Sequence, residues 1–188
     1  MRIYTKAGDD GTTGLFLGGR VSKADALMAA CGDLDEAVAA LGLARAALPA
    51  AGGPGEEGIA DLVLTLQRDL FVVAADLATN PEHRDRLKDG ISRVTPAMVG
   101  RLEEEIDARV ARHPLRPVFI VPGANPASAA LDHARTVVRR AERAVVALTG
   151  TDRPVTAEVT AYVNRLSDLV FVLARAAAGE VDEPPSHE

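Results

Sequence analysis

Apolar residues recur at helical spacing along most of this chain, and this pattern constrains the fold more than any other feature. The first two sets are Leu27, Leu34, Val38, Leu41 and Leu48, and then Leu62, Leu66, Leu70, Val73 and Leu77. Steps of three, four and seven residues place each set on one face of a helix. Because hydrophobic residues make up 47% of the chain and aromatic residues only 3%, Ala, Val and Leu must fill the core. That composition favours close helix packing over a β-sandwich.

Start and stop signals divide the pattern into five helices. The predicted ranges are about 22–48, 57–79, 95–112, 125–149 and 157–178. Ser22 with Asp25 three residues later is typical of a capping box, and Thr95-Pro96 and Asn125-Pro126 each pair a cap residue with Pro in the first turn. Short links between the helices predict an all-α bundle with antiparallel neighbours.

The segments outside these helices have weaker patterns. Residues 1–21 are rich in Gly and Thr and are expected to be irregular. Residues 81–94 are charged and unpatterned, which indicates a surface loop. Residues 118–121 are apolar and are expected to be extended. The acidic tail with two prolines, residues 179–188, is expected to be disordered.

Length and charge exclude several classes of protein. The 188 residues indicate one domain, residues 1–188, with its bundle in residues 22–178. A net charge of −6 gives no overall basic footprint for nucleic acid. The single cysteine, Cys31, cannot form an intrachain disulfide, which fits a reducing cytoplasm. The sequence begins without the apolar stretch of a signal peptide, and no apolar run is long enough to span a membrane.

The segment Thr5–Gly14 has the composition of a phosphate-binding loop. Its glycines allow the backbone N–H groups to approach a ligand closely, and its Thr hydroxyls and Lys6 add donors. It is not a Walker A loop, because Arg20 and Val21 follow Gly19 where that motif has Lys and Ser or Thr. The alternative is a flexible leader without a ligand.

The fourth predicted helix carries a cluster of arginines. Arg135, Arg139, Glu142 and Arg143 share one face, with Arg140 to the side. The rest of this helix is Ala, Val and Leu, so we expect it to be buried, and buried arginines need anions. Guanidinium groups suit carboxylate or phosphate. The alternative is a solvated basic face.

Two other polar sets could complete a site. The run Asp33-Leu34-Asp35-Glu36 flanks the apolar stripe of the first helix and could supply carboxylates to the arginines, or could face solvent. On the last helix, Asn164, Asp168 and Arg175 form a polar stripe beside Phe171, which could bind a ligand or join helices. The four histidines are scattered and form no helical ligand pair, so we predict no protein-built metal site.

Four stretches, in this order, resemble the PduO-type family of ATP:cob(I)alamin adenosyltransferases. They are YTKAGDDGTTGLFLGGRVSKAD, GDLDEAVAALGLARA, FIVPGANPASAALDHARTVVRRAERAVVAL and YVNRLSDLVFVLAR. The resemblance implies a five-helix bundle that forms a homotrimer with active sites between subunits. It also implies an enzyme that moves the 5′-deoxyadenosyl group of ATP to the Co(I) of a reduced corrinoid, giving adenosylcobalamin and triphosphate.

The resemblance also assigns roles to residues. For ATP it implies Thr5, Lys6, Ala7, Gly8, Thr13, Gly14, Lys23, Arg139, Arg140, Glu142, Arg143 and Asn164. The residues it places in the reaction are Asp35, Phe119, Arg135, Arg139 and Asn164. Among these, Asp35 and Arg135 resemble an intersubunit ion pair near the corrinoid, and Phe119 resembles the aromatic at the lower face of cobalt.

Mg²⁺ would accompany ATP, and an external electron donor would be needed because the sequence has no flavin or iron–sulfur signature. Ala7, Ala124-Asn125 and Asp132 depart from the family's usual residues. The departures at Ala124-Asn125 and Asp132 keep open an alternative function, a corrinoid- or nucleotide-binding carrier that performs no chemistry. A bundle that only assembles is a third hypothesis.

Overall fold

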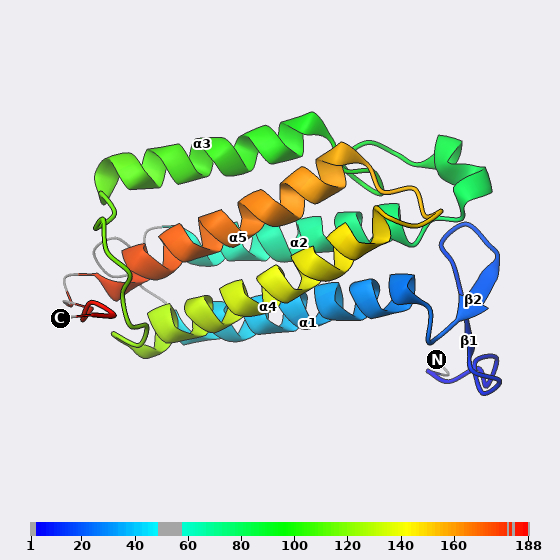
Figure 1. The fold of residues 1–188 in the computed structure, drawn as a ribbon, viewed down its shortest axis with the longest axis horizontal. Helices are drawn as coiled ribbons and strands as arrows, with labels where there is room; N and C mark the ends of the chain where they lie inside the picture. Colours follow the sequence, from blue (N-terminus) through cyan, green and yellow to red (C-terminus); the bar gives the residue numbers. More distant parts are fainter. Residues whose placement is uncertain (1–2, 49–57, 180, 182, 188) are drawn as a thin grey trace.

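The fold is a bundle of five long helices, as the apolar pattern predicts. The computed structural model describes residues 3–48, 58–179, 181 and 183–187. Its helices are α1 (Ala26–Ala47), α2 (Ile59–Leu77), α3 (Pro96–Arg112), α4 (Pro126–Leu148) and α5 (Ala157–Ala178). They lie side by side along the long axis of the molecule (Figure 1). The predicted ranges agree within a few residues, although the expected start of the second helix at residue 57 lies outside the described residues.

Ala, Val and Leu fill the core, as the composition requires. α4 packs against both α1 and α5, while α3 packs against α5 and α2 against α1. Leu34, Leu66, Val138 and Leu169 are at most 1% exposed. Burying one large apolar side chain of this kind stabilises the folded state by about 1.5–3 kcal/mol. None of the helices among the described residues is both long and apolar enough to cross a bilayer.

The helix caps confirm two of the three predicted starts. Thr95 accepts a hydrogen bond from the backbone N–H of Met98, and Asn125 forms a capping box with Ser128. The expected cap at Ser22 is wrong, because its backbone is used in strand pairing with Thr12. Instead, the carboxylate of Asp25 caps α1 by accepting from the N–H of Leu27 at 2.9 Å.

The N-terminal segment is less irregular than expected. Strands β1 (Thr12–Gly14) and β2 (Arg20–Ser22) form an antiparallel hairpin at the end of the bundle where α1 begins (Figure 1). Phe16 docks it on the end of α2, through backbone hydrogen bonds of 2.9 Å with Ala78 and with Asn80. Gly19 has a φ of 86°, and a Cβ there would lie 3.1 Å from the Asn80 amide nitrogen.

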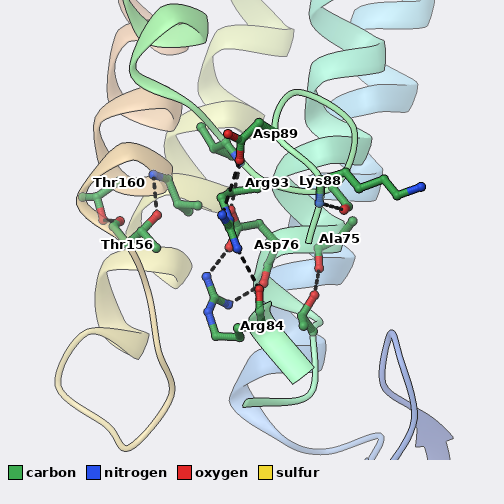
Figure 2. A network of polar contacts seen from close by, with 12 residues as sticks. Ala75, Asp76, Arg84, Lys88, Asp89, Arg93, Thr156 and Thr160 are labelled. Carbon is green, nitrogen blue, oxygen red and sulfur yellow. Dashed lines mark hydrogen bonds and ion pairs between the residues drawn. The ribbon is translucent and has the colours of Figure 1, made fainter. Parts of the chain in front are cut away.

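The expected surface loop at 81–94 is instead attached to a buried carboxylate. It begins with the 3₁₀ helix η1 (Pro81–Arg86), and Leu87 and Val94 are buried. Asp76 on α2 is 1% exposed and accepts from Arg84 at 2.5 Å and from the backbone N–H of Val94 at 2.9 Å (Figure 2). The sequence pattern missed this contact because one arginine of this charged loop, Arg84, pairs with a buried acid on another element.

The tail beyond α5 is ordered at its described residues 183–187, which we call the C-terminal strap. Val121 donates its N–H to the carbonyl of Pro184, and Ser186 donates to that of Phe119, both at 2.8 Å. Ile120 forms an antiparallel bridge with Pro185. The expectation of disorder is therefore wrong for the strap, and the expected extended backbone at 118–121 is observed at this bridge.

Candidate active site

An open pocket of about 630 Å³, which we call the main pocket, lies over α5 between α3 and α4. The segment that follows α3 closes one side of it. Phe119 and Phe171 line its apolar part, while Arg135 and Arg139 of α4 and Arg175 of α5 line its charged part. The volume falls within the range of about 300–1,000 Å³ that small-molecule pockets occupy.

Phe119 is the most exposed aromatic side chain of this pocket, at 85%. It projects from the segment that the C-terminal strap holds by backbone hydrogen bonds. Phe171 lies under two cations, because the guanidinium carbons of Arg175 and Arg135 are 5.1 and 6.0 Å from its ring centroid. An aromatic side chain so exposed beside a pocket indicates a surface that a ligand or another chain covers.

A buried ionic network forms the floor of the main pocket. Asp132 is 4% exposed and contacts Arg175 as well as Arg135, the latter at 3.3 Å. Arg175 also lies 2.9 Å from the carboxylate of Glu183 in the strap. Burial is the main cause that raises the pKa of Glu183. Asp132 and Arg175 stand out separately in the sequence, but Glu183 does not, because nothing local predicts that the tail folds back onto α5.

Within one chain, Arg139 and Arg143 of α4 are exposed, although we expected them to be buried because the rest of the helix is apolar. The Arg139 side chain is 50% exposed and lies 4.0 Å from Glu142. Arg143 is also exposed and donates to the backbone carbonyl of Arg139. The inference from burial is wrong, because the Ala and Val face of α4 packs inward while the arginines face outward. Asn164 of α5 joins the row, since its amide donates to Glu142 at 2.8 Å.

Arg140 has the carboxylate partners that were expected from the first helix. Its guanidinium lies 3.0 Å from Asp33 and contacts Glu36. The hydrogen bonds that Arg140 donates to Glu36, and secondly to Asp33, raise the pKa of Arg140. Asp35 is exposed, and within one chain Arg135 pairs with Asp132 rather than with Asp35. The Asp35–Arg135 pair between subunits stays a prediction.

The Gly/Thr-rich segment forms a compact turn, with Lys23 folded across it. The Lys23 ammonium donates to the carbonyl of Gly8 at 2.8 Å, and the Arg20 guanidinium donates to that of Ala7 at 2.5 Å. A Cβ on Gly8 would lie 3.0 Å from the Lys23 nitrogen and 3.1 Å from the backbone oxygen of Thr12, so a larger residue here would have to push the Lys23 side chain or the backbone aside by a few tenths of an ångström. The side chain of Thr5 accepts from the N–H of Ala7, and Lys6 has a φ of 62°.

The structure therefore brings together some predicted site residues and separates others. Phe119, Arg135 and Arg139 share the main pocket, and Glu142 and Asn164 continue the same face toward the end of α4. The N-terminal segment expected to bind ATP lies at the hairpin end of the bundle (Figure 1). Its expected ATP-binding residues are Thr5, Lys6, Ala7, Gly8, Thr13, Gly14 and Lys23. Among the described residues, none of the hydrogen bonds or ion pairs joins this loop to Arg139, Arg140 or Arg143.

Known proteins resemble this chain over nearly its whole length. The family model described as cobalamin adenosyltransferase matches residues 3–177. A corrinoid adenosyltransferase of Mycobacterium tuberculosis is 43% identical over 186 residues, which cover 96% of this chain and 91% of the relative. A corrinoid adenosyltransferase of Bacillus subtilis is 41% identical, with 93% and 86% covered.

Solved structures agree with this relationship. A variant PduO-type ATP:corrinoid adenosyltransferase from Lactobacillus reuteri, complexed with cobalamin and ATP, superposes with a TM-score of 0.86 at 30% identity, and each chain is covered completely. Another variant of that protein, complexed with ATP, gives a TM-score of 0.82 at 30% identity, with 98% of each chain covered. By sequence and by fold, this chain belongs to the cobalamin adenosyltransferase family.

Proposed function

We propose that the described site allows this ATP-dependent corrinoid adenosyltransferase to move the 5′-deoxyadenosyl group of ATP onto the Co(I) of a reduced corrinoid. One feature of the site carries this function. The aromatic side chain of Phe119, which precedes α4, and the guanidinium groups of Arg135 and Arg139 on α4 line the same pocket. A planar macrocycle suits the first part and a polyphosphate suits the second.

The chemistry requires little reactive machinery from the protein. Co(I) is the nucleophile and attacks C5′ of the ribose; the new Co–C bond forms as the C5′–O bond to triphosphate breaks. The electron pair of the broken bond leaves with the triphosphate, whose negative charge Arg139 and Arg143 would stabilise. Holding the carbon and cobalt in line would supply much of the remaining acceleration.

The N-terminal loop is our candidate for the other half of the ATP site. Lys23 and the backbone around Gly8 already form a tight turn, in which the Lys23 ammonium donates to the Gly8 carbonyl. ATP would exchange the Gly8 carbonyl for phosphate as the partner of the Lys23 ammonium. Thr5, Lys6, Thr13 and Gly14 would complete this loop. Because the loop lies away from the α4 arginines of its own chain, we propose that it acts on those of a neighbour in a homotrimer.

The corrinoid side of the site is assigned to Phe119 and to the ion pair of Asp35 with Arg135. Phe119 would occupy the lower face of cobalt and keep the lower axial ligand away, which favours four-coordinate Co(II) and eases its reduction. Asp35 would reach Arg135 of the next subunit. The apolar pocket would exclude water and so protect Co(I) from protonation. The electron for the reduction would come from an external donor.

Mg²⁺ fits this site only as a companion of ATP. Among the described residues there is no group of three His, Cys, Asp or Glu side chains placed to hold a metal ion. Mg²⁺ commonly needs only one or two carboxylates when phosphates and waters supply its other ligands. Glu142, beside Asn164 and Arg139, is the carboxylate best placed to do so. The cytoplasmic location stays a prediction that rests on the single Cys31.

The test is to mix the purified protein with ATP, Mg²⁺ and chemically reduced corrinoid, and to follow the visible spectrum for the alkylcobalt product. We expect Arg139→Ala to lower kcat by about 10²–10³-fold, the usual effect of removing one preorganised donor. Asn164→Ala should also lose activity. Arg68→Ala is the matched control, because Arg68 is an exposed arginine of α2 outside the pocket.

Two results would contradict the proposal in different ways. Wild-type turnover in both Arg139→Ala and Asn164→Ala would show that the site assignment is wrong. Binding of corrinoid and ATP without any alkylcobalt product would instead favour the carrier alternative.

A further inference from the structure

The exposed side chain of Phe119 depends for its position on the backbone that carries it. The side chain is 85% exposed, and the segment 113–125 between α3 and α4 is not helical. Where both partners are described, the backbone-to-backbone hydrogen bonds of residues 114–124 both join this segment to the C-terminal strap. Val121 donates to the carbonyl of Pro184, and the carbonyl of Phe119 itself accepts from Ser186. The strap therefore fixes the main chain at Phe119.

The sequence of the strap makes it stiff. Pro184 and Pro185 fix their own φ at about −65° and favour extended backbone in the residue before each. The pairing with the Phe119 segment uses the carbonyl of Pro184 and the N–H of Ser186, so neither proline has to donate a hydrogen bond. A constraint at one end of the strap, Glu183, is therefore transmitted to the contact at Ser186.

Glu183 anchors the strap to the floor of the main pocket. It is 6% exposed, and its carboxylate lies 2.9 Å from Arg175. Arg175 is itself held in place, because it contacts Asp132 of α4 and lies 5.1 Å from the centroid of the Phe171 ring. The backbone carbonyl of Glu183 also accepts from Arg116 at 2.9 Å. A buried ion pair is costly to break from one side, so this end of the strap stays closed.

We propose that Glu183 is a positioning residue for Phe119. Its ion pair with Arg175 holds the strap, and the strap holds the backbone of Phe119 beside the main pocket. This inference rests on the proposed function, in which Phe119 occupies the lower face of cobalt and keeps the lower axial ligand away. When the strap opens, Phe119 leaves that place for part of the time, and the lower ligand returns to the cobalt.

The first measurement is hydrogen exchange of the protein without ligands, followed by mass spectrometry at the peptide that contains Val121. Glu183→Gln removes the charge but keeps the size, and we expect exchange there to become about tenfold faster because the strap opens more often. Ser186→Pro should act in the same direction, since it removes the N–H that donates to Phe119. Ser186→Ala keeps that N–H, and Glu104→Gln changes an exposed residue of α3 outside the main pocket, so both should exchange like wild type.

The second measurement tests whether Glu183 acts through Phe119. With cobalamin and ATP, Glu183→Gln should lower kcat about tenfold, which is within the usual coupling of residues in one network. In the Phe119→Ala background the same change should lower kcat by less than about twofold, because the side chain to be positioned is already absent. KM for ATP should stay close to the wild-type value, since the strap holds no residue assigned to ATP. Glu183→Asp keeps the charge and should restore part of kcat.

Faster exchange at Val121 together with a fall in kcat that depends on Phe119 supports the proposal. Unchanged exchange in Glu183→Gln would overturn it. A kcat that falls equally in the two backgrounds, or in neither, would overturn it as well. If wild-type protein formed no alkylcobalt product, the proposed function would fail, and the exchange measurement would still decide whether Glu183 fixes the Phe119 segment.

Discussion

Replacing Asp76 by Ala is expected to lower the free energy of unfolding by about 3–5 kcal/mol, the usual cost of breaking a buried ion pair from one side. The Asp76 carboxylate is 1% exposed and accepts from Arg84 and from the backbone N–H of Val94. The Arg84 side chain is only 19% exposed, so the variant would leave a poorly hydrated cation without its carboxylate. It would also leave the Val94 N–H without its acceptor.

The assay is urea unfolding followed by circular dichroism at 222 nm, with the midpoint and the slope m fitted together. For a chain of this size the same loss corresponds to a fall in Tm of roughly 6–20 °C. Asp89→Ala is the matched control from the same network (Figure 2). Asp89 is 72% exposed and lies 3.4 Å from Arg93, so its loss should cost less than about 1 kcal/mol.

Two outcomes would refute this reasoning. If Asp76→Ala and Asp89→Ala lowered the free energy of unfolding by the same amount, burial would not determine how much each ion pair of this network contributes to stability. If Asp76→Ala lost less than about 1 kcal/mol without a change in m, the 81–94 segment would not depend on the buried carboxylate.

Two further predictions concern titrating groups. Burial raises the pKa of the Cys31 thiol to about 11. Iodoacetamide at pH 8 should therefore label this thiol at least a hundredfold more slowly than in urea-unfolded protein, as followed by mass spectrometry. Equal labelling rates would contradict this prediction. Asp25→Ala should cost about 0.5–2 kcal/mol at neutral pH through loss of the α1 cap. The hydrogen bond from the Leu27 N–H holds the pKa of Asp25 below its ordinary value of 3.8, so this cost should be present above that pH and disappear as the pH falls through the lowered pKa. Urea titrations from pH 7 to pH 3 measure it, and a cost that grew toward pH 3 would refute the assignment.

Local physics explains why the sequence predicted the helices so closely. The period of apolar residues, the cap residues Thr95 and Asn125 and the prolines after them act within a few positions, so they can be read without the fold.

The predicted site residues were recognised through residue type and order along the chain. Arg139, Asn164 and Phe119 lie on three different segments, and the apolar pattern says nothing about how far apart these segments are. The structure was needed to show that Phe119 and Arg139 share a pocket and that Arg140 pairs with Asp33.

What the sequence by itself determined is the class of fold, because helices depend on a local apolar period. The residues of an ATP- and corrinoid-binding site were assigned through resemblance to a family, and they stay a proposal. Only the tertiary structure decided that the charged 81–94 segment turns onto Asp76 and that the tail returns to Arg175 and Phe119. Each of these contacts joins residues distant in sequence. Their energy comes from desolvated charges and backbone hydrogen bonds, which leave no periodic pattern in the chain.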